Sequence, residues 1–285
     1  MNKQKEFSET EQLEELNRFL SKFALEDAIL ILDGPGPCCA KQSIWLARLG
    51  IERLRQFSEI HLFSASAYNF LFYWARSERQ FKYDSTSITR WNRENQVRHR
   101  VLPLYLHWLV YFGKTIFGRP IFNGDLLAAA LTTSVQQSFS SQRVSGLPSN
   151  LNFWTYEIVK EEFVPINNSC DLFLDIDVAS TMCAVASVPK IYSPFRLKNK
   201  VFQDAAVSPG FSRQLLKLLR SKKPAIVLSM NRNGWKGSIF FLKLYEFENA
   251  QEQILLDQRR FISGFDKPEF NDELRIGLFE TEPID

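Results

Sequence analysis

The 285-residue chain is poor in histidine, and this scarcity excludes one common kind of hydrolytic site. Its three histidines are His61, His99 and His107, so none follows an aspartate near the end of the chain, such as Asp204. The Ser, Asp, His order of the α/β-hydrolases therefore cannot be completed after Asp204. A serine nucleophile in this chain needs a base of another kind.

Cysteine is also scarce, and its spacing does not indicate a metal site. No C-x-x-C pair occurs among the four cysteines, which are Cys38, Cys39, Cys170 and Cys183. Zinc sites usually show such pairs, so we expect no metal, and no motif implies an organic cofactor. Cys38 and Cys39 are hard to join to each other without strain, and free thiols in a reducing compartment fit best.

Long apolar runs are missing as well. A membrane-spanning helix needs about 18 or more consecutive apolar residues, whereas the nearest approach, 101–112, is shorter and contains His107. The first 20 residues are charged, so we expect no signal peptide and a cytoplasmic protein. The net charge of +3 is small; it argues against a nucleic-acid partner and leaves peripheral contact with an anionic membrane surface open.

Aromatic residues, in contrast, are abundant: they make up 14% of the chain and include 25 phenylalanines. Many of them lie between Tyr68 and Phe122. This enrichment favours a bulky core, and the alternative is an apolar pocket or interfacial surface for acyl chains.

The order of expected elements indicates an α/β fold. Apolar strands at 28–32 and 59–63 flank a helix at 40–55, which is a βαβ unit of a parallel sheet. No repeat or linker is visible, so we expect one domain over 1–285. The other expected helices are 8–23, much of 66–137, 180–188 and 211–220, and the other expected strands are 151–160, 171–176, 225–230, 237–247 and 274–279.

Ser64 lies where a strand is followed by a helical stretch that begins at Ala65. This is the setting of a nucleophile elbow, in which the helix N-terminus faces the developing negative charge. His61 precedes the serine by three residues on the same strand, which does not give a triad geometry. Asp204 follows a turn-rich segment and can act on the serine directly.

A Gly- and Pro-rich turn follows the first strand and can supply the hydrogen-bond donors that an oxyanion needs. Its prolines have no N–H group, which leaves the backbone amides of Gly34, Gly36, Cys38 and Cys39. Taken alone, the turn fits an ordinary strand-to-helix connection better.

Taken in order, these segments resemble the motifs of the patatin-like lipid acyl hydrolases. That family carries D-G-G-G-x-R/K-G, then G-x-S-x-G, then D-G-G or D-G-A; this chain has DGPGPCC at 33–39, LFSASA at 62–67 and DAA at 204–206. The approach AVASVPKIYSPF at 184–195 resembles the family's A-x-x-A-S-x-P-x-x-F-x-P stretch. The resemblance covers residues 28–210.

The resemblance implies a three-layer α/β/α patatin-like domain with a central, mostly parallel sheet. It implies that Ser64 is the nucleophile and Asp204 the base, and that Gly34 and Gly36 belong to the oxyanion loop, beside Ala65 at the start of the next helix. The implied reaction is hydrolysis of a lipid or other acyl ester through an acyl-serine intermediate. An acyltransferase or a thioesterase acting on an acyl carrier is the alternative.

All three motifs contain departures from the family's pattern. Leu62 and Ser66 replace both elbow glycines, Cys38 stands where the family has Arg or Lys, and Ala205 replaces the glycine after the aspartate. A degenerate member that binds an acyl ligand or a partner without turnover is therefore a further alternative, and Ser66 is a rival nucleophile. Leu62 is expected either to pack into the core or to crowd the turn.

Overall fold

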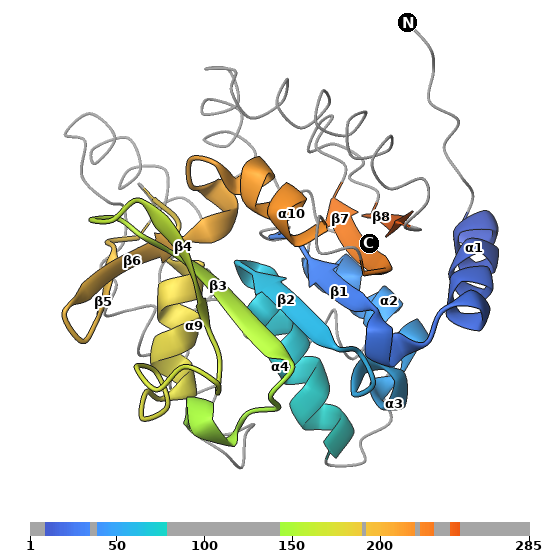
Figure 1. The fold of residues 1–285 in the computed structure, drawn as a ribbon, viewed down its shortest axis with the longest axis horizontal. Helices are drawn as coiled ribbons and strands as arrows, with labels where there is room; N and C mark the ends of the chain where they lie inside the picture. The colour runs from blue at the N-terminus through green and yellow to red at the C-terminus, as the bar shows by residue number, and fades with distance from the viewer. Residues whose placement is uncertain are drawn as a thin grey trace, which may run out of the picture.

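The computed structural model describes residues 9–34, 39–78, 143–189, 192–219, 223–230 and 240–245 (Figure 1). The helices in these ranges are α1 (Glu9–Lys22), α2 (Cys39–Leu49), α3 (Ile51–Leu54), α4 (Ala65–Glu78), α9 (Val178–Ala186) and α10 (Phe211–Leu219). The strands are β1 (Ile29–Leu32), β2 (Glu59–Phe63), β3 (Leu151–Glu157), β4 (Glu162–Ile166), β5 (Phe195–Leu197), β6 (Lys200–Asp204), β7 (Ala225–Met230) and β8 (Phe240–Tyr245).

The strands form one mixed sheet in the order β5-β6-β3-β2-β1-β7-β8, with β4 also paired to β3. Its centre is parallel: β1 pairs with β2 and β7, and β2 pairs with β3. β4, β5, β6 and β8 add antiparallel pairs around it. The α/β class and the parallel centre that the sequence predicts are confirmed.

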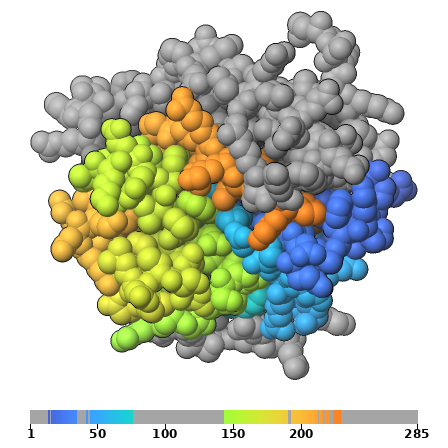
Figure 2. Space-filling view, viewed as in Figure 1, coloured from blue at the N-terminus to red at the C-terminus, as the bar shows by residue number. Residues whose placement is uncertain are grey.

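Both faces of the sheet are covered, which explains why β1 reads as an unbroken apolar run. Successive side chains of a strand point to opposite faces. Leu30 and Leu32 belong to the core cluster that also holds residues of α1, α2, α4 and α9, whereas Ile29 and Ile31 pack in a second cluster with α10. Figure 2 shows the orange atoms of the segment that includes α10 beside the green atoms of the segment that includes β3 and β4.

Several predicted elements need correction. The helix expected over 40–55 is divided into α2 and α3 at Gly50, whose φ of 78° takes the chain out of the helical conformation. The strand expected over 171–176 is a series of turns, in which Phe173 N–H donates to Cys170 O and Ile176 N–H to Phe173 O. Phe173 and Ile176 are buried, so the apolar pattern there reflects core packing without a strand.

The strand expected over 151–160 ends at Glu157, and the chain then returns as β4. β4 is not predicted from the sequence, since it is short and contains Pro165, a residue that is disfavoured inside strands. The expected elements within 79–142 and at 274–279 lie outside the described residues, as do most of the aromatic residues between Tyr68 and Phe122.

None of the helices in the described ranges has the length and apolar character needed to cross a membrane.

Candidate active site

The register of β3 brings the ends of two other strands together. Phe63, the last residue of β2, pairs with Trp154, and Asp204, the last residue of β6, pairs with the next residue, Thr155. β4 occupies the other edge of β3 at these positions, so β2 and β6 must share one edge and approach each other end to end. Ser64 follows β2 and therefore meets Asp204.

Ser64 adopts a backbone conformation that is uncommon for a residue with a side chain. Its φ of 51° lies in the left-handed region, between the end of β2 and the start of α4 at Ala65. This is the strained strand-to-helix turn expected of a nucleophile elbow. The side chain is almost enclosed, with 6% of its surface exposed.

The hydroxyl of Ser64 donates a hydrogen bond to Oδ2 of Asp204, the contact that the sequence predicts. The other carboxylate oxygen, Oδ1, accepts the backbone N–H of Ala206 at 2.8 Å. Asp204 N–H donates to Ser187 O at 2.9 Å, and Ser208 Oγ donates to Asp204 O at 2.6 Å. The buried carboxylate is thus fixed through both its side chain and its backbone.

Gly34 lies directly against this pair. A Cβ added at Gly34 would be 2.5 Å from Ser64 Cβ, 2.6 Å from Ala206 Cβ and 3.3 Å from Ser64 Oγ. No side chain fits there, so the end of β1 can approach the serine only as glycine. Of the other candidate oxyanion residues, Gly36 and Cys38 lie outside the described residues, and Cys39 is described only as the first residue of α2.

Leu62, Ser66 and Ala205, which replace glycines of the family pattern, do not adopt a glycine conformation. Leu62 lies in β2, Ser66 lies in α4 and Ala205 begins a short 3-10 turn; the described non-glycine residues with positive φ are Ser64, Glu161 and Lys198. Leu62 is fully buried in the same core cluster as Phe153. It points into the core and does not crowd the elbow.

Ser66, the rival nucleophile, makes a different contact. Its hydroxyl donates to the backbone carbonyl of Asp33 at the end of β1, whereas Ser64 donates to the carboxylate of Asp204. Ser66 is fully buried in the described structure. Of the two serines, Ser64 is the one whose hydroxyl contacts a carboxylate.

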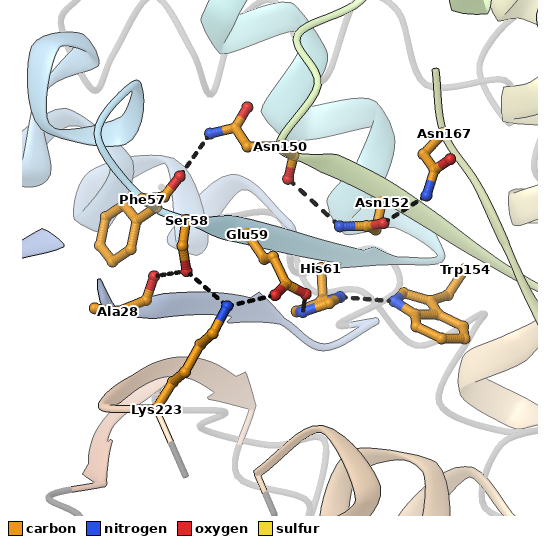
Figure 3. A network of polar contacts seen from close by, with 10 residues as sticks. All are labelled: Ala28, Phe57, Ser58, Glu59, His61, Asn150, Asn152, Trp154, Asn167 and Lys223. Carbon is orange, nitrogen blue, oxygen red and sulfur yellow. Dashed lines mark hydrogen bonds and ion pairs between the residues drawn. The ribbon is translucent and has the colours of Figure 1, made fainter. Parts of the chain in front are cut away.

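His61 belongs to a separate network of polar contacts (Figure 3). Its Nδ1 accepts the indole N–H of Trp154 at 3.1 Å, so the ring proton lies on Nε2, which contacts Glu59 Oε2 at 3.2 Å. Lys223 Nζ contacts Glu59 Oε1 at 2.7 Å. Hydrogen bonding to His61 is the largest cause that lowers the pKa of Glu59 to about 2, with Lys223 adding to it.

Sequence reasoning missed the supporting polar residues around the site. Gln42 Nε2 donates to Asp33 O at 3.0 Å and to Leu228 O at 3.2 Å, from within α2. Ser187 and Ser208 hold the backbone of Asp204. Nothing in the local sequence of Gln42 signals this contact, because Leu228 lies far along the chain. Ser208, four residues after Asp204, fits a local turn and could have been suggested.

Within the described ranges, no three His, Cys, Asp or Glu side chains are grouped so that they could hold a metal ion. Cys170 and Cys183 are free thiols. Burial is the main cause that raises the pKa of Cys183 to about 12, which makes it a poor nucleophile.

No protein-family model matches this chain, and no curated protein gives a significant sequence match.

Proposed function

We propose that this chain is a patatin-like serine acyl hydrolase in which Ser64 and Asp204 form a dyad. The observation that carries the proposal is the hydrogen bond from Ser64 Oγ to Asp204 Oδ2 at a left-handed strand-to-helix turn. A serine in this setting has a base in contact, and the following helix directs its N-terminus toward the place where charge develops.

The chemistry follows from these contacts. Asp204 Oδ2 takes the proton of Ser64 as Oγ attacks the carbonyl carbon of an ester. When the tetrahedral intermediate collapses, the alcohol leaves with that proton and the acyl group stays on Ser64. Asp204 then takes a proton from water, the resulting hydroxide attacks the acyl-serine, and the acid is released as the proton returns to Ser64.

The oxyanion in both tetrahedral intermediates needs fixed backbone donors. Gly34 lies against Ser64, and the first residues of α4, beginning at Ala65, follow the nucleophile directly. These are the donors that we assign to the oxyanion. The substrate class, a lipid or other acyl ester, comes from the motif resemblance.

The arrangement of elements supports a three-layer patatin-like domain as the finer fold assignment. The motif residues follow β1 and β2 and end β6, and helices lie on both faces of the sheet. The inward position of Leu62 supports an active enzyme over a degenerate one, since the elbow keeps its shape without the family's glycine.

A fluorophosphonate probe tests the proposal, because it reacts with activated serines. Wild type should be labelled and should hydrolyse a panel of p-nitrophenyl acyl esters, whereas Ser64→Ala should do neither. Its free energy of unfolding should fall by about 1.5–3 kcal/mol, the contribution of one hydrogen bond to a charged group. Label that persists on Ser64→Ala would assign the reactivity to another serine.

Asp204→Asn tests whether the aspartate acts as the base for Ser64. The amide keeps the shape of the carboxyl group but cannot take a proton, so kcat should fall by roughly 100-fold or more. Ser58→Ala is the matched control, since its hydroxyl donates to Ala28 O at 2.8 Å at the opposite end of β2. An Asp204→Asn variant as active as Ser58→Ala would remove the aspartate from the mechanism.

A further inference from the structure

The backbone carbonyl of Asp33 is held by two buried side chains from different helices. Gln42 Nε2 in α2 donates to it at 3.0 Å, and Ser66 Oγ in α4 donates to it as well. Both side chains are completely buried. Gln42 also donates to Leu228 O in β7, so it ties the ends of two neighbouring strands together.

This carbonyl belongs to the same peptide unit as the N–H of Gly34. The described chain contains no cis peptide bond, and in a planar trans peptide the C=O and the N–H point in opposite directions. Two donors that fix the Asp33 carbonyl therefore also fix the direction of the Gly34 N–H, which must point away from Ser66 and Gln42.

Gly34 lies in the connection that follows β1. It is so close to Ser64 and Ala206 that a Cβ added to it would clash with both. If this peptide rotated, its carbonyl dipole would replace the N–H near the serine and would repel a developing oxyanion. The orientation of the Asp33–Gly34 peptide therefore decides whether an N–H group or a carbonyl oxygen faces the developing oxyanion.

We propose that Ser66 is a positioning residue for the oxyanion: together with Gln42 it locks the Asp33–Gly34 peptide so that the Gly34 N–H serves as a donor. The inference rests on the proposed hydrolase function and assigns a role to a side chain that the family motif does not have, since the motif places glycine there. The hydroxyl supplies a second anchor that glycine lacks.

Ser66→Ala removes the hydrogen bond to the Asp33 carbonyl and changes little else. We expect kcat for a p-nitrophenyl ester to fall on the order of 10-fold to 100-fold, less than the full loss of an oxyanion donor. KM should stay within about threefold, because the contact acts on the transition state and not on ground-state binding. Fluorophosphonate labelling of Ser64 should slow by a similar factor.

Three further variants separate positioning from a structural role. Ser66→Thr keeps the hydroxyl and should retain more of kcat than Ser66→Ala, and Gln42→Leu removes the other donor and should also lower kcat. Ser58→Ala loses a hydroxyl-to-carbonyl hydrogen bond of the same kind at the opposite end of β1. It should melt at a lower temperature with kcat unchanged.

The outcomes distinguish the inference from the proposed function. If wild type is neither labelled nor active, the hydrolase proposal fails and the inference fails with it. If wild type is active but Ser66→Ala and Gln42→Leu keep kcat within about twofold, only the inference is overturned. An equal fall in kcat for Ser58→Ala would also overturn it, since the effect would then be a general loss of structure.

Discussion

At the scale of single residues, the site depends on small side chains in places where nothing larger fits. Ser64 holds a left-handed conformation, Gly34 lies against it, and Ala206 lies against the same side of Gly34. The closeness of these residues brings the segment after β1, Ser64 and the turn after Asp204 into one small volume.

Gly34→Ala tests this closeness. The new Cβ would be 2.5 Å from Ser64 Cβ and 2.6 Å from Ala206 Cβ, and both neighbours are fixed to the backbone, so the strands must shift. We expect the free energy of unfolding to fall by about 1–3 kcal/mol, as for other overpacked sites, and labelling of Ser64 to be lost. Urea denaturation and probe labelling measure the two effects. A fully stable and fully labelled variant would contradict the tight contact.

Leu62 provides a second residue-scale test, of whether the missing elbow glycine matters. Because its side chain is completely buried, Leu62→Gly should lower the free energy of unfolding by about 3 kcal/mol, through a cavity and added backbone entropy. Ester hydrolysis should not increase. Thermal melts and esterase assays on the same preparation decide the point, and activity that appears only in Leu62→Gly would identify wild type as a degenerate member.

At the scale of elements, β3 contacts both the proposed dyad and a polar network on one face of the sheet. Its register at Trp154 and Thr155 joins the ends of β2 and β6 at the proposed dyad. On the face packed against α10, the Trp154 indole stacks on Phe63. Its N–H also donates to His61, His61 contacts Glu59, and Glu59 contacts Lys223 (Figure 3). Glu59 and Lys223, the charged residues of this network, lie at or near the start of β2, at the opposite end of the strand from Ser64.

This network predicts a pH dependence of stability. The pKa of Glu59 is lowered from 4.5 to about 2 in the folded protein, so its contribution is present above pH 4.5 and is lost as the pH falls toward 2. Because 42% of the side chain is exposed, solvent screening reduces the contribution to about 1 kcal/mol.

Thermal melts of wild type and Glu59→Gln measure this contribution. At pH 7 the variant should melt at the lower temperature, and the difference should shrink between pH 4.5 and pH 2, where the wild-type carboxylate takes up a proton. Labelling of Ser64 at pH 7 should be unchanged, because the network lies away from the dyad. A difference between the two proteins that does not change with pH would contradict the ionic role of Glu59.

At the scale of the whole molecule, the described chain is a mixed sheet with a parallel centre and helices on both faces (Figure 1). The predicted strands 59–63 and 225–230 match β2 and β7, since buried parallel strands are short, continuous apolar runs with clear ends. The turns at 171–176 were mistaken for a strand, because burial of Phe173 and Ile176 produces the same local pattern. β4 was missed, since its pairing to β3 is visible only in the register.

The sequence by itself indicated the α/β class and the strand-to-helix turn at Ser64, because both follow from local apolar runs. It also indicated the pairing of this serine with Asp204, through the order of the short motifs. Only the tertiary structure decided that Leu62 packs inward, that Ser66 and Gln42 hold the Asp33 carbonyl, and that His61 is bound to Trp154 and Glu59. These contacts join residues on different elements, and their partners are set by strand register and helix packing, which no local pattern of residue types specifies.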